Sequence, residues 1–205
     1  MTYMPPVMAP LATIKCPECK GAANFAFATY QIFQKENQKY FEQSKNFEVF
    51  KGQHSHGSYY RAALYYPGLR NSLENIKDLP DGYERSMWKH THWHVTLPKE
   101  LSNTGAIRCT ECLVQKKHKL IWPDDAYFQI EYKGQVLWAF DRKYALKLLA
   151  YIESDERKKR IIGYSGNPWN KIYSQDWFLR HIPEHFQTAK ARPEIVKKLR
   201  ELLGI

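Results

Sequence analysis

Two Cys-x-x-Cys hooks constrain this chain more than any other feature of its sequence. They are Cys16-Pro17-Glu18-Cys19 and Cys109-Thr110-Glu111-Cys112, and they contain all four cysteines of the 205 residues. Each hook follows a β-branched residue and a cation, Ile14-Lys15 in the first case and Ile107-Arg108 in the second. A closed zinc site takes four soft ligands in a tetrahedron, so the hooks predict one zinc ion held by Cys16, Cys19, Cys109 and Cys112.

Two alternatives use the same cysteines, namely a pair of disulfides and a redox-active dithiol pair. A reducing intracellular compartment favours metal binding over disulfides, and neither hook begins a clear helix within a βαβ unit. Four thiolates leave no open coordination position, so the expected zinc is structural. The gap of 89 residues between Cys19 and Cys109 is long for a zinc ribbon. The entropy of closing such a loop grows only logarithmically with its length, so the gap is no obstacle.

Composition and hydropathy predict a soluble, cytoplasmic protein that does not enter a membrane. Hydrophobic residues make up 43% of the chain and aromatic residues 15%, enough to fill a core. The first residues, Met1–Pro6, lack the charged and apolar regions of a signal peptide. No apolar run approaches the roughly 20 residues that span a bilayer.

Periodicity predicts an α+β fold. Residues 11–15 and 25–30 read as strands on either side of the first hook, where Pro17 and Gly21 suit a tight turn and Gly21 can take a positive φ. Strands are also predicted at 118–122, 127–132 and 135–140, the last two joined by Lys133-Gly134. Asp141 stands where a helix N-cap belongs. Two apolar stripes at helical spacing follow, and they are Ala145, Leu148, Leu149 and Ile152, then Ile195, Val196, Leu199 and Leu202.

The expected architecture is a small antiparallel zinc-ribbon-like sheet with C-terminal helices packed on it. We predict a single domain over 1–205, with 34–103 as an ordered insertion and 141–205 as the mainly helical C-terminal part. The insertion holds too many aromatic residues for a free linker, and residues 46–50 and 58–66 read as a hairpin.

Charge points to polyanionic partners. The net charge is +10, and residues 103–205 carry 19 Lys/Arg against 12 Asp/Glu. Such a field favours nucleic acid or an acidic protein partner. Candidate phosphate contacts are Lys116, Lys117, Lys119, Arg157, Lys158, Lys159 and Arg160. The aromatic residues Trp122, Tyr127, Tyr132 and Trp138 either stack on unpaired bases or belong to the core.

Histidines form a second group of possible metal ligands. His54 and His56 share one face of an extended chain, as do His90, His92 and His94, and clustered imidazoles bind zinc, copper or nickel. A catalytic site would add a carboxylate at a fixed spacing, and no His-Glu-x-x-His motif occurs. The alternative is a polar edge rich in His and Trp.

These features together indicate a non-enzymatic structural-zinc protein that binds nucleic acid or acts in a nucleic-acid-handling complex. No Gly-x-Ser-x-Gly, phosphate-binding loop or dinucleotide fingerprint is present. A protein–protein adaptor is the alternative, and a metal-dependent hydrolase or nuclease using the histidines is a weaker one.

The paired hooks and the hairpin after them resemble the zinc-ribbon class. Residues 136–142 (VLWAFDR), 182–186 (IPEHF) and 188–192 (TAKAR) are also similar to small bacterial zinc-ribbon proteins of unassigned function. The resemblance implies a metal-ligand role for the four cysteines and no particular activity.

Overall fold

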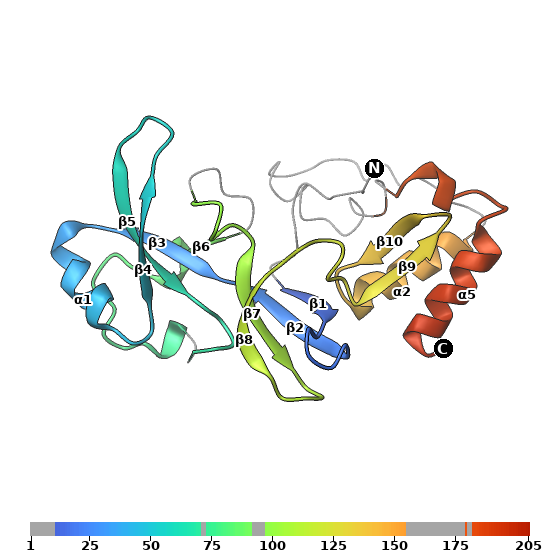
Figure 1. Ribbon diagram of the computed structural model, residues 1–205, viewed down its shortest axis with the longest axis horizontal. Coiled ribbons are helices and arrows are strands. Elements are labelled where there is room, and N and C mark those ends of the chain that lie inside the picture. The colour runs from blue at the N-terminus through green and yellow to red at the C-terminus, as the bar shows by residue number, and fades with distance from the viewer. Residues whose placement is uncertain (1–10, 71–72, 92–96, 155–178, 180–181) are drawn as a thin grey trace. The chain divides into compact units, whose positions relative to one another are not determined.

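The computed structural model describes residues 11–70, 73–91, 97–154, 179 and 182–205, and these divide between two compact units (Figure 1). One unit consists of Met1–Lys15 and Trp122–Ile205, and the other of Cys16–Ile121. We call them the terminal unit and the central unit. The class is mixed α and β with antiparallel sheets.

In the terminal unit, the segment Trp122–Ile205 begins with a two-stranded hairpin. Strands β9 (Phe128–Tyr132) and β10 (Gln135–Ala139) pair antiparallel, with Gln135 opposite Tyr132. Lys133 and Gly134 both have positive φ, 50° and 72°, which is the geometry of a two-residue turn that matches strand twist. The predicted hairpin is confirmed here. Strand β1 (Leu11–Lys15) adds backbone hydrogen bonds, from the Thr13 N–H to the Phe140 carbonyl (2.7 Å) and from the Lys15 N–H to the Asp125 carbonyl (2.8 Å).

Two helices pack on this hairpin. Helix α2 (Arg142–Glu153) contacts β10, α5 (Arg192–Leu203) contacts β9, and the helices contact each other. The side chain of Asp141 caps α2 by accepting a hydrogen bond from the Tyr144 N–H (2.8 Å). Gly204, in the left-handed conformation, ends α5. A short 3-10 turn, η4 (Glu184–Phe186), precedes α5.

The apolar stripes fill the core of this unit. The four residues predicted for α2 are all buried, as predicted. In α5 the buried residues are Ile195, Leu199 and Leu203, while Val196 and Leu202 are half-buried, so the stripe is rotated from the predicted one. We expected the helices to cover the sheet that carries the cysteines. Within this unit they pack on the β9–β10 hairpin, which carries buried aromatic residues, and packing on the sheet of the cysteines stays a prediction.

The central unit begins with the sheet that carries the hooks. Strands β2 (Ala22–Phe27), β7 (Thr104–Cys109) and β8 (Gln115–Lys119) lie in this order and pair antiparallel. Strand β8 starts three residues before the predicted one, directly after the second hook. Phe25, Phe27 and Ile107 are fully buried.

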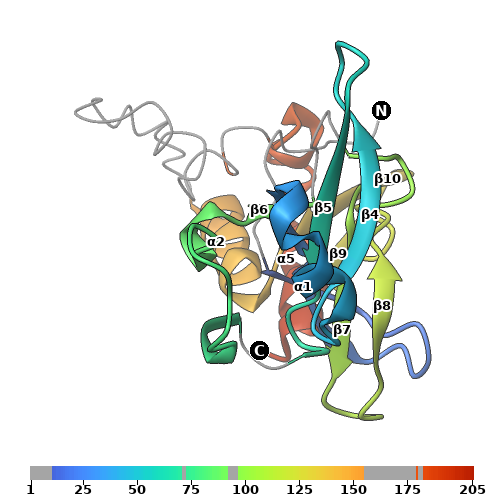
Figure 2. The same ribbon diagram turned by 90° about the vertical axis from the view of Figure 1, so that its left-hand side faces the viewer.

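A second sheet has the order β4-β5-β3-β6. Its strands are β3 (Thr29–Phe33), β4 (Glu48–Gln53), β5 (Tyr59–Tyr65) and β6 (Lys89–His90). The 3-10 turn η1 (Lys35–Asn37) and helix α1 (Gln38–Gln43) connect β3 to β4, and the turns η2 (Leu73–Asn75) and η3 (Arg85–Met87) precede β6. Helix α1 contacts β4, and the β4–β5 hairpin projects beyond the sheet (Figures 1 and 2). The predicted hairpin over 46–66 is therefore confirmed.

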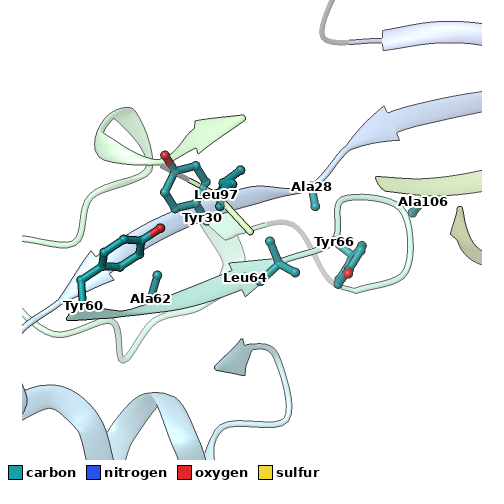
Figure 3. Close-up of a cluster of buried hydrophobic side chains, with 8 residues drawn as sticks. All are labelled: Ala28, Tyr30, Tyr60, Ala62, Leu64, Tyr66, Leu97 and Ala106. Carbon is teal, nitrogen blue, oxygen red and sulfur yellow. The ribbon is translucent and has the colours of Figure 1, made fainter. Parts of the chain in front are cut away.

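Alternating burial gives this sheet a core on each face. Tyr60, Ala62 and Leu64 of β5 meet Tyr30 of β3 and Leu97 in one cluster (Figure 3). The intervening residues Ala63 and Tyr65 belong to a second cluster with Phe33, Phe41, Phe47, Leu73, Tyr83 and Trp88. A strand with both faces covered explains why this part of the chain carries so many aromatic residues.

The two sheets of the central unit meet at Ala28, between β2 and β3. Its N–H donates to the Thr104 carbonyl (3.0 Å), and its carbonyl accepts from the Thr91 N–H (2.9 Å). The Thr91 hydroxyl also donates to the Thr104 carbonyl (2.6 Å). These bonds satisfy backbone groups that would otherwise be buried without a partner where the two sheets meet.

Among the described residues, no helix has the length and apolar character needed to cross a membrane.

Candidate metal centre

The two hooks have the same backbone conformation. The Cys16 N–H donates to the Gly21 carbonyl (2.8 Å), and the Cys109 N–H donates to the Val114 carbonyl (3.0 Å). In each hook this closes a turn from the first cysteine to the residue five positions later. The residue before that acceptor, Lys20 in one hook and Leu113 in the other, has a positive φ of 64° or 61°. The matching conformation presents both cysteines of each hook in the same way.

Gly21 serves the first hook differently from our prediction. The positive φ that we expected at Gly21 falls on Lys20. Gly21 instead leaves room for the carboxylate of Glu111, since an added Cβ would lie 2.0 Å from its Oε2. Glu111 Oε2 is also 4.0 Å from the Cys19 Sγ. This contact between the hooks was not predicted from the sequence, although Gly21 stands beside one hook and Glu111 within the other.

Strand pairing brings the hooks together across 89 residues. The first hook leads into β2 and the second follows β7, and these strands are antiparallel with Ala23 opposite Cys109. The start of β2 therefore lies beside the end of β7. The sheet register places the two hooks side by side, and their turns bring the four thiols into one cluster.

The geometry of the cluster suits a metal ion. The Sγ atoms of Cys16 and Cys112 are 3.6 Å apart, as are those of Cys19 and Cys109, and all four lie within 4.8 Å of one another. Zinc–sulfur bonds of about 2.3 Å in a tetrahedron put sulfurs about 3.8 Å apart. All four cysteines are free thiols. The predicted ligands are thus close enough to hold one ion, and the donor set is that of a closed zinc site.

The thiols differ in exposure and proton affinity. Cys16 and Cys109 are buried, whereas Cys19 and Cys112 are exposed. A hydrogen bond from the Cys19 backbone N–H is the main cause that lowers the pKa of the Cys16 thiol to about 7. The Gly21 N–H lowers the pKa of Cys19, but desolvation and the other three thiols outweigh it and raise this pKa to about 12.

Cys112 follows the pattern of Cys19. Against the lowering effect of the Val114 N–H, desolvation and the Cys16 and Cys109 thiols raise the pKa of Cys112. Without an ion, Cys19 and Cys112 therefore keep their protons at neutral pH. A divalent cation would displace them, because only thiolates are ligands.

Charged groups surround the hooks. Glu18 forms an ion pair with Lys116, whose hydrogen bond is the main cause that lowers the pKa of the Glu18 carboxyl. The Lys20 Nζ donates to the Pro17 carbonyl (3.2 Å) within the first hook. Because a zinc ion with four thiolates has a net charge of −2, these ammonium groups are favourably placed beside it.

Three of the five predicted phosphate-binding lysines are on β8, and all three have partners within the protein. Lys116 pairs with Glu18, and Lys117 pairs with Glu48 (2.5 Å) and lies 4.9 Å from the centroid of the Tyr66 ring. The Lys119 Nζ donates to the Lys99 carbonyl (2.9 Å). The other predicted contacts, Arg157, Lys158, Lys159 and Arg160, lie outside the described residues.

The structure brings together only part of the predicted histidine group. His54 and His56, in the β4–β5 turn, have parallel rings with centroids 5.1 Å apart, and His56 Nε2 is 2.6 Å from the Ser58 hydroxyl. His90 is exposed on β6, and His92 and His94 lie outside the described residues. In the described ranges, the cysteines are the one group of three or more possible ligands. A second metal stays a prediction.

Three of the four aromatic residues offered as base-stacking platforms are core residues. Trp138 is fully buried, and its ring packs edge-on against Trp122, with centroids 5.0 Å apart. Tyr132 is also buried, and Tyr127 is half-buried. The core interpretation of Trp122, Tyr132 and Trp138 is therefore the correct one, because a buried ring has no face open to a base.

Comparison of the chain with protein-family models, curated proteins and solved structures finds no match. The resemblance to zinc ribbons therefore depends on the hooks and the strands around them.

Proposed function

We propose that the four cysteines hold one zinc ion whose role is structural. The observation that carries this proposal is the closed set of four thiols contributed by two matching hooks. Four thiolates fill the coordination of zinc and leave no position for water or substrate. The ion then ties the start of β2 to the end of β7.

The protein that this ion stabilises binds nucleic acid, by itself or within a larger complex, and is not an enzyme. The net charge of +10 supports this function. The partners of Lys116 and Lys117 do not exclude phosphate contacts, since these side chains are 40% and 47% exposed. Ion pairs at such exposure contribute only about 0–1 kcal/mol, so a phosphate can replace the carboxylate.

Metal analysis of the purified protein tests the structural-zinc part. We expect one zinc per chain, and loss of the zinc in Cys16→Ser. Thr110→Ser is the matched control, because it changes a residue of the second hook that is no ligand, and it should keep the metal. A Cys16→Ser protein with a full complement of zinc would contradict the proposal.

Binding of labelled single- and double-stranded oligonucleotides at several salt concentrations tests the nucleic-acid part. Reversal of three charges, Lys116→Glu, Lys117→Glu and Lys119→Glu, should weaken binding and reduce its salt dependence. The matched control reverses three lysines of the terminal unit, Lys143, Lys147 and Lys197, and should retain more affinity. If the wild-type protein binds neither oligonucleotide at low salt, the proposal of nucleic-acid binding is contradicted.

One observation favours the adaptor alternative. Leu113, at the turn of the second hook, is 77% exposed, and Ile121 is 61% exposed. Exposed apolar side chains of this kind suit contact with another protein. Cross-linking in cells with a probe placed at position 113 tests this candidate, and recovery of no protein partner would count against it.

A further inference from the structure

A row of side chains crosses the second sheet of the central unit. Phe33 of β3 lies opposite Arg61 of β5, and Arg61 lies opposite Lys51 of β4. Directly paired residues of antiparallel strands point to the same face, so these three share one face. Tyr59, two residues before Arg61, is on this face as well.

This row lies where the aromatic core of that face ends. Phe33 belongs to the core that Phe41 of α1 covers, and the rings of Phe33 and Phe41 stack at 4.8 Å. Beyond Phe33 the face is cationic and exposed rather than apolar. A cavity of about 390 Å³ opens here, and among the residues that line it are Phe33, Lys35, Gln38, Lys51, Tyr59 and Arg61. Cavities for small ligands measure about 300–1,000 Å³.

The lining of the cavity contains three cations and no carboxylate. Arg61 donates to Glu42 Oε1 (3.1 Å), which also accepts from the Gln38 amide (2.8 Å), so Glu42 holds both side chains from outside the lining. Within the part of the chain that the structure describes, no carboxylate pairs with Lys35 or Lys51. The cavity therefore has an excess of positive charge that the fold itself leaves uncompensated.

An exposed aromatic ring stands beside these charges. Tyr59 is 65% exposed, and the Lys51 Nζ lies 4.0 Å from the centroid of its ring. An exposed aromatic ring beside cations can stack on a nucleic-acid base. The arrangement of a ring, an ammonium group and further cations matches a ligand with a flat base and a phosphate.

The β3 side of the cavity is held in place. The Tyr83 hydroxyl accepts hydrogen bonds from the Gln34 N–H (3.0 Å) and from the Asn37 side-chain amide (3.2 Å). These bonds fix both ends of the segment that carries Lys35. A site that is ordered before the ligand arrives loses less entropy on binding.

We propose that this cavity binds a nucleotide unit, with its base on Tyr59 and its phosphate between Lys35, Lys51 and Arg61. The inference rests on the proposed function for its class of ligand and adds a contact on the β3–β5 face to the one proposed on β8. The unit is either a free nucleotide or one residue of a single strand, since both have the same base and phosphate.

The experiment compares two probes, a fluorescent twelve-residue oligothymidylate and free AMP, on the full chain with its metal. The variants are Tyr59→Ala and the pair Lys35→Ala with Lys51→Ala. Lys39→Ala with Lys45→Ala is the matched control, because both lysines are exposed in the same unit and neither lines the cavity. Equal zinc content and circular dichroism show that each variant is folded.

We expect Tyr59→Ala to weaken oligothymidylate binding about 5- to 100-fold, as loss of one stacked base does. The double lysine variant should lower the slope of log affinity against log salt by about 0.7, which is one phosphate contact on a single strand. The control should change neither. AMP binding that the same variants abolish would identify a free nucleotide as the ligand.

Three other outcomes separate this inference from the proposed function. Oligothymidylate binding that is lost with the β8 lysines and unchanged in the cavity variants overturns the inference and leaves nucleic-acid binding intact. AMP binding at the cavity without oligonucleotide binding supports the inference and overturns the proposed function. If neither probe binds at low salt, both are overturned.

Discussion

Among the described residues, the terminal unit packs two helices of twelve residues on a hairpin, whereas the central unit has two sheets, one helix of six residues and the four thiols. In the terminal unit, the buried stripes of α2 and α5 supply continuous apolar surface. In the central unit, the hooks stand at the start of β2 and the end of β7, with their first cysteines buried and their second cysteines exposed. The difference is that packed apolar side chains stabilise one unit, whereas the hook end of the other has four thiols close enough to hold an ion.

Removal of the metal should have the largest effect, and it should destabilise the central unit without changing the terminal unit. A structural zinc contributes about 10–16 kcal/mol of apparent binding free energy in small domains, so a chelator or Cys109→Ser should release the hooks. We expect faster amide hydrogen exchange in β2, β7 and β8, measured by mass spectrometry, with α2 and α5 unchanged. Equal acceleration in both units would show that the ion stabilises the whole chain and would contradict the contrast.

Truncation of a core residue in α2 should destabilise the terminal unit without changing the central unit. Leu148 of α2 is fully buried, so Leu148→Ala should destabilise the terminal unit by about 2–5 kcal/mol while zinc content is unchanged. Denaturant unfolding followed by tryptophan fluorescence measures the loss. Leu146→Ala, which removes the same atoms from a side chain that is 41% exposed in the same helix, is the control and should cost much less.

A change of pH should act on the central unit alone. At neutral pH the protons on Cys19, whose pKa is raised to about 12, and on Cys112, whose pKa is also raised, must leave before an ion binds. Zinc binding should therefore release at least two protons, and affinity should fall about 100-fold per unit of falling pH. A pH-indicator dye in weak buffer measures the release. A zinc affinity independent of pH between 6 and 8 would contradict thiolate ligation.

The smallest expected effect is at a helix cap. Asp141→Ala removes the acceptor for the Tyr144 N–H and should cost the terminal unit about 1 kcal/mol. Thermal unfolding measures the cost, and Asp141→Ser, which keeps an acceptor, should restore most of the stability. Because the cap is remote from the hooks in the chain, zinc affinity should not change.

Local patterns predicted the local elements well. Lys133-Gly134 between two alternating runs predicted the β9–β10 turn, and Asp141 before an apolar stripe predicted the start of α2. The hooks predicted the four thiols that cluster closely enough to hold an ion, because their cysteines are the only ones in the chain. Each of these signals lies within a few residues of what it determines, so no distant contact is needed to read it.

The zinc-ribbon fold as a whole, the single-domain organisation and the partner stay predictions. The structure instead adds features that the sequence analysis did not contain. Phe33, Arg61 and Lys51 come from three strands, and only their register joins them. Trp122 and Trp138 read equally well as core or as surface, because an aromatic residue suits both.

The sequence by itself determined the two hooks, the β9–β10 hairpin and the apolar stripe of α2, since each follows from neighbouring residues and their backbone preferences. Tertiary structure decided which strands lie side by side, and hence how four thiols separated by 89 residues meet within 4.8 Å. It also decided which lysines have a carboxylate partner and which line a cavity. Those properties depend on side chains that strand pairing and packing bring together from distant parts of the chain. A local sequence pattern does not indicate which distant residues will be in contact.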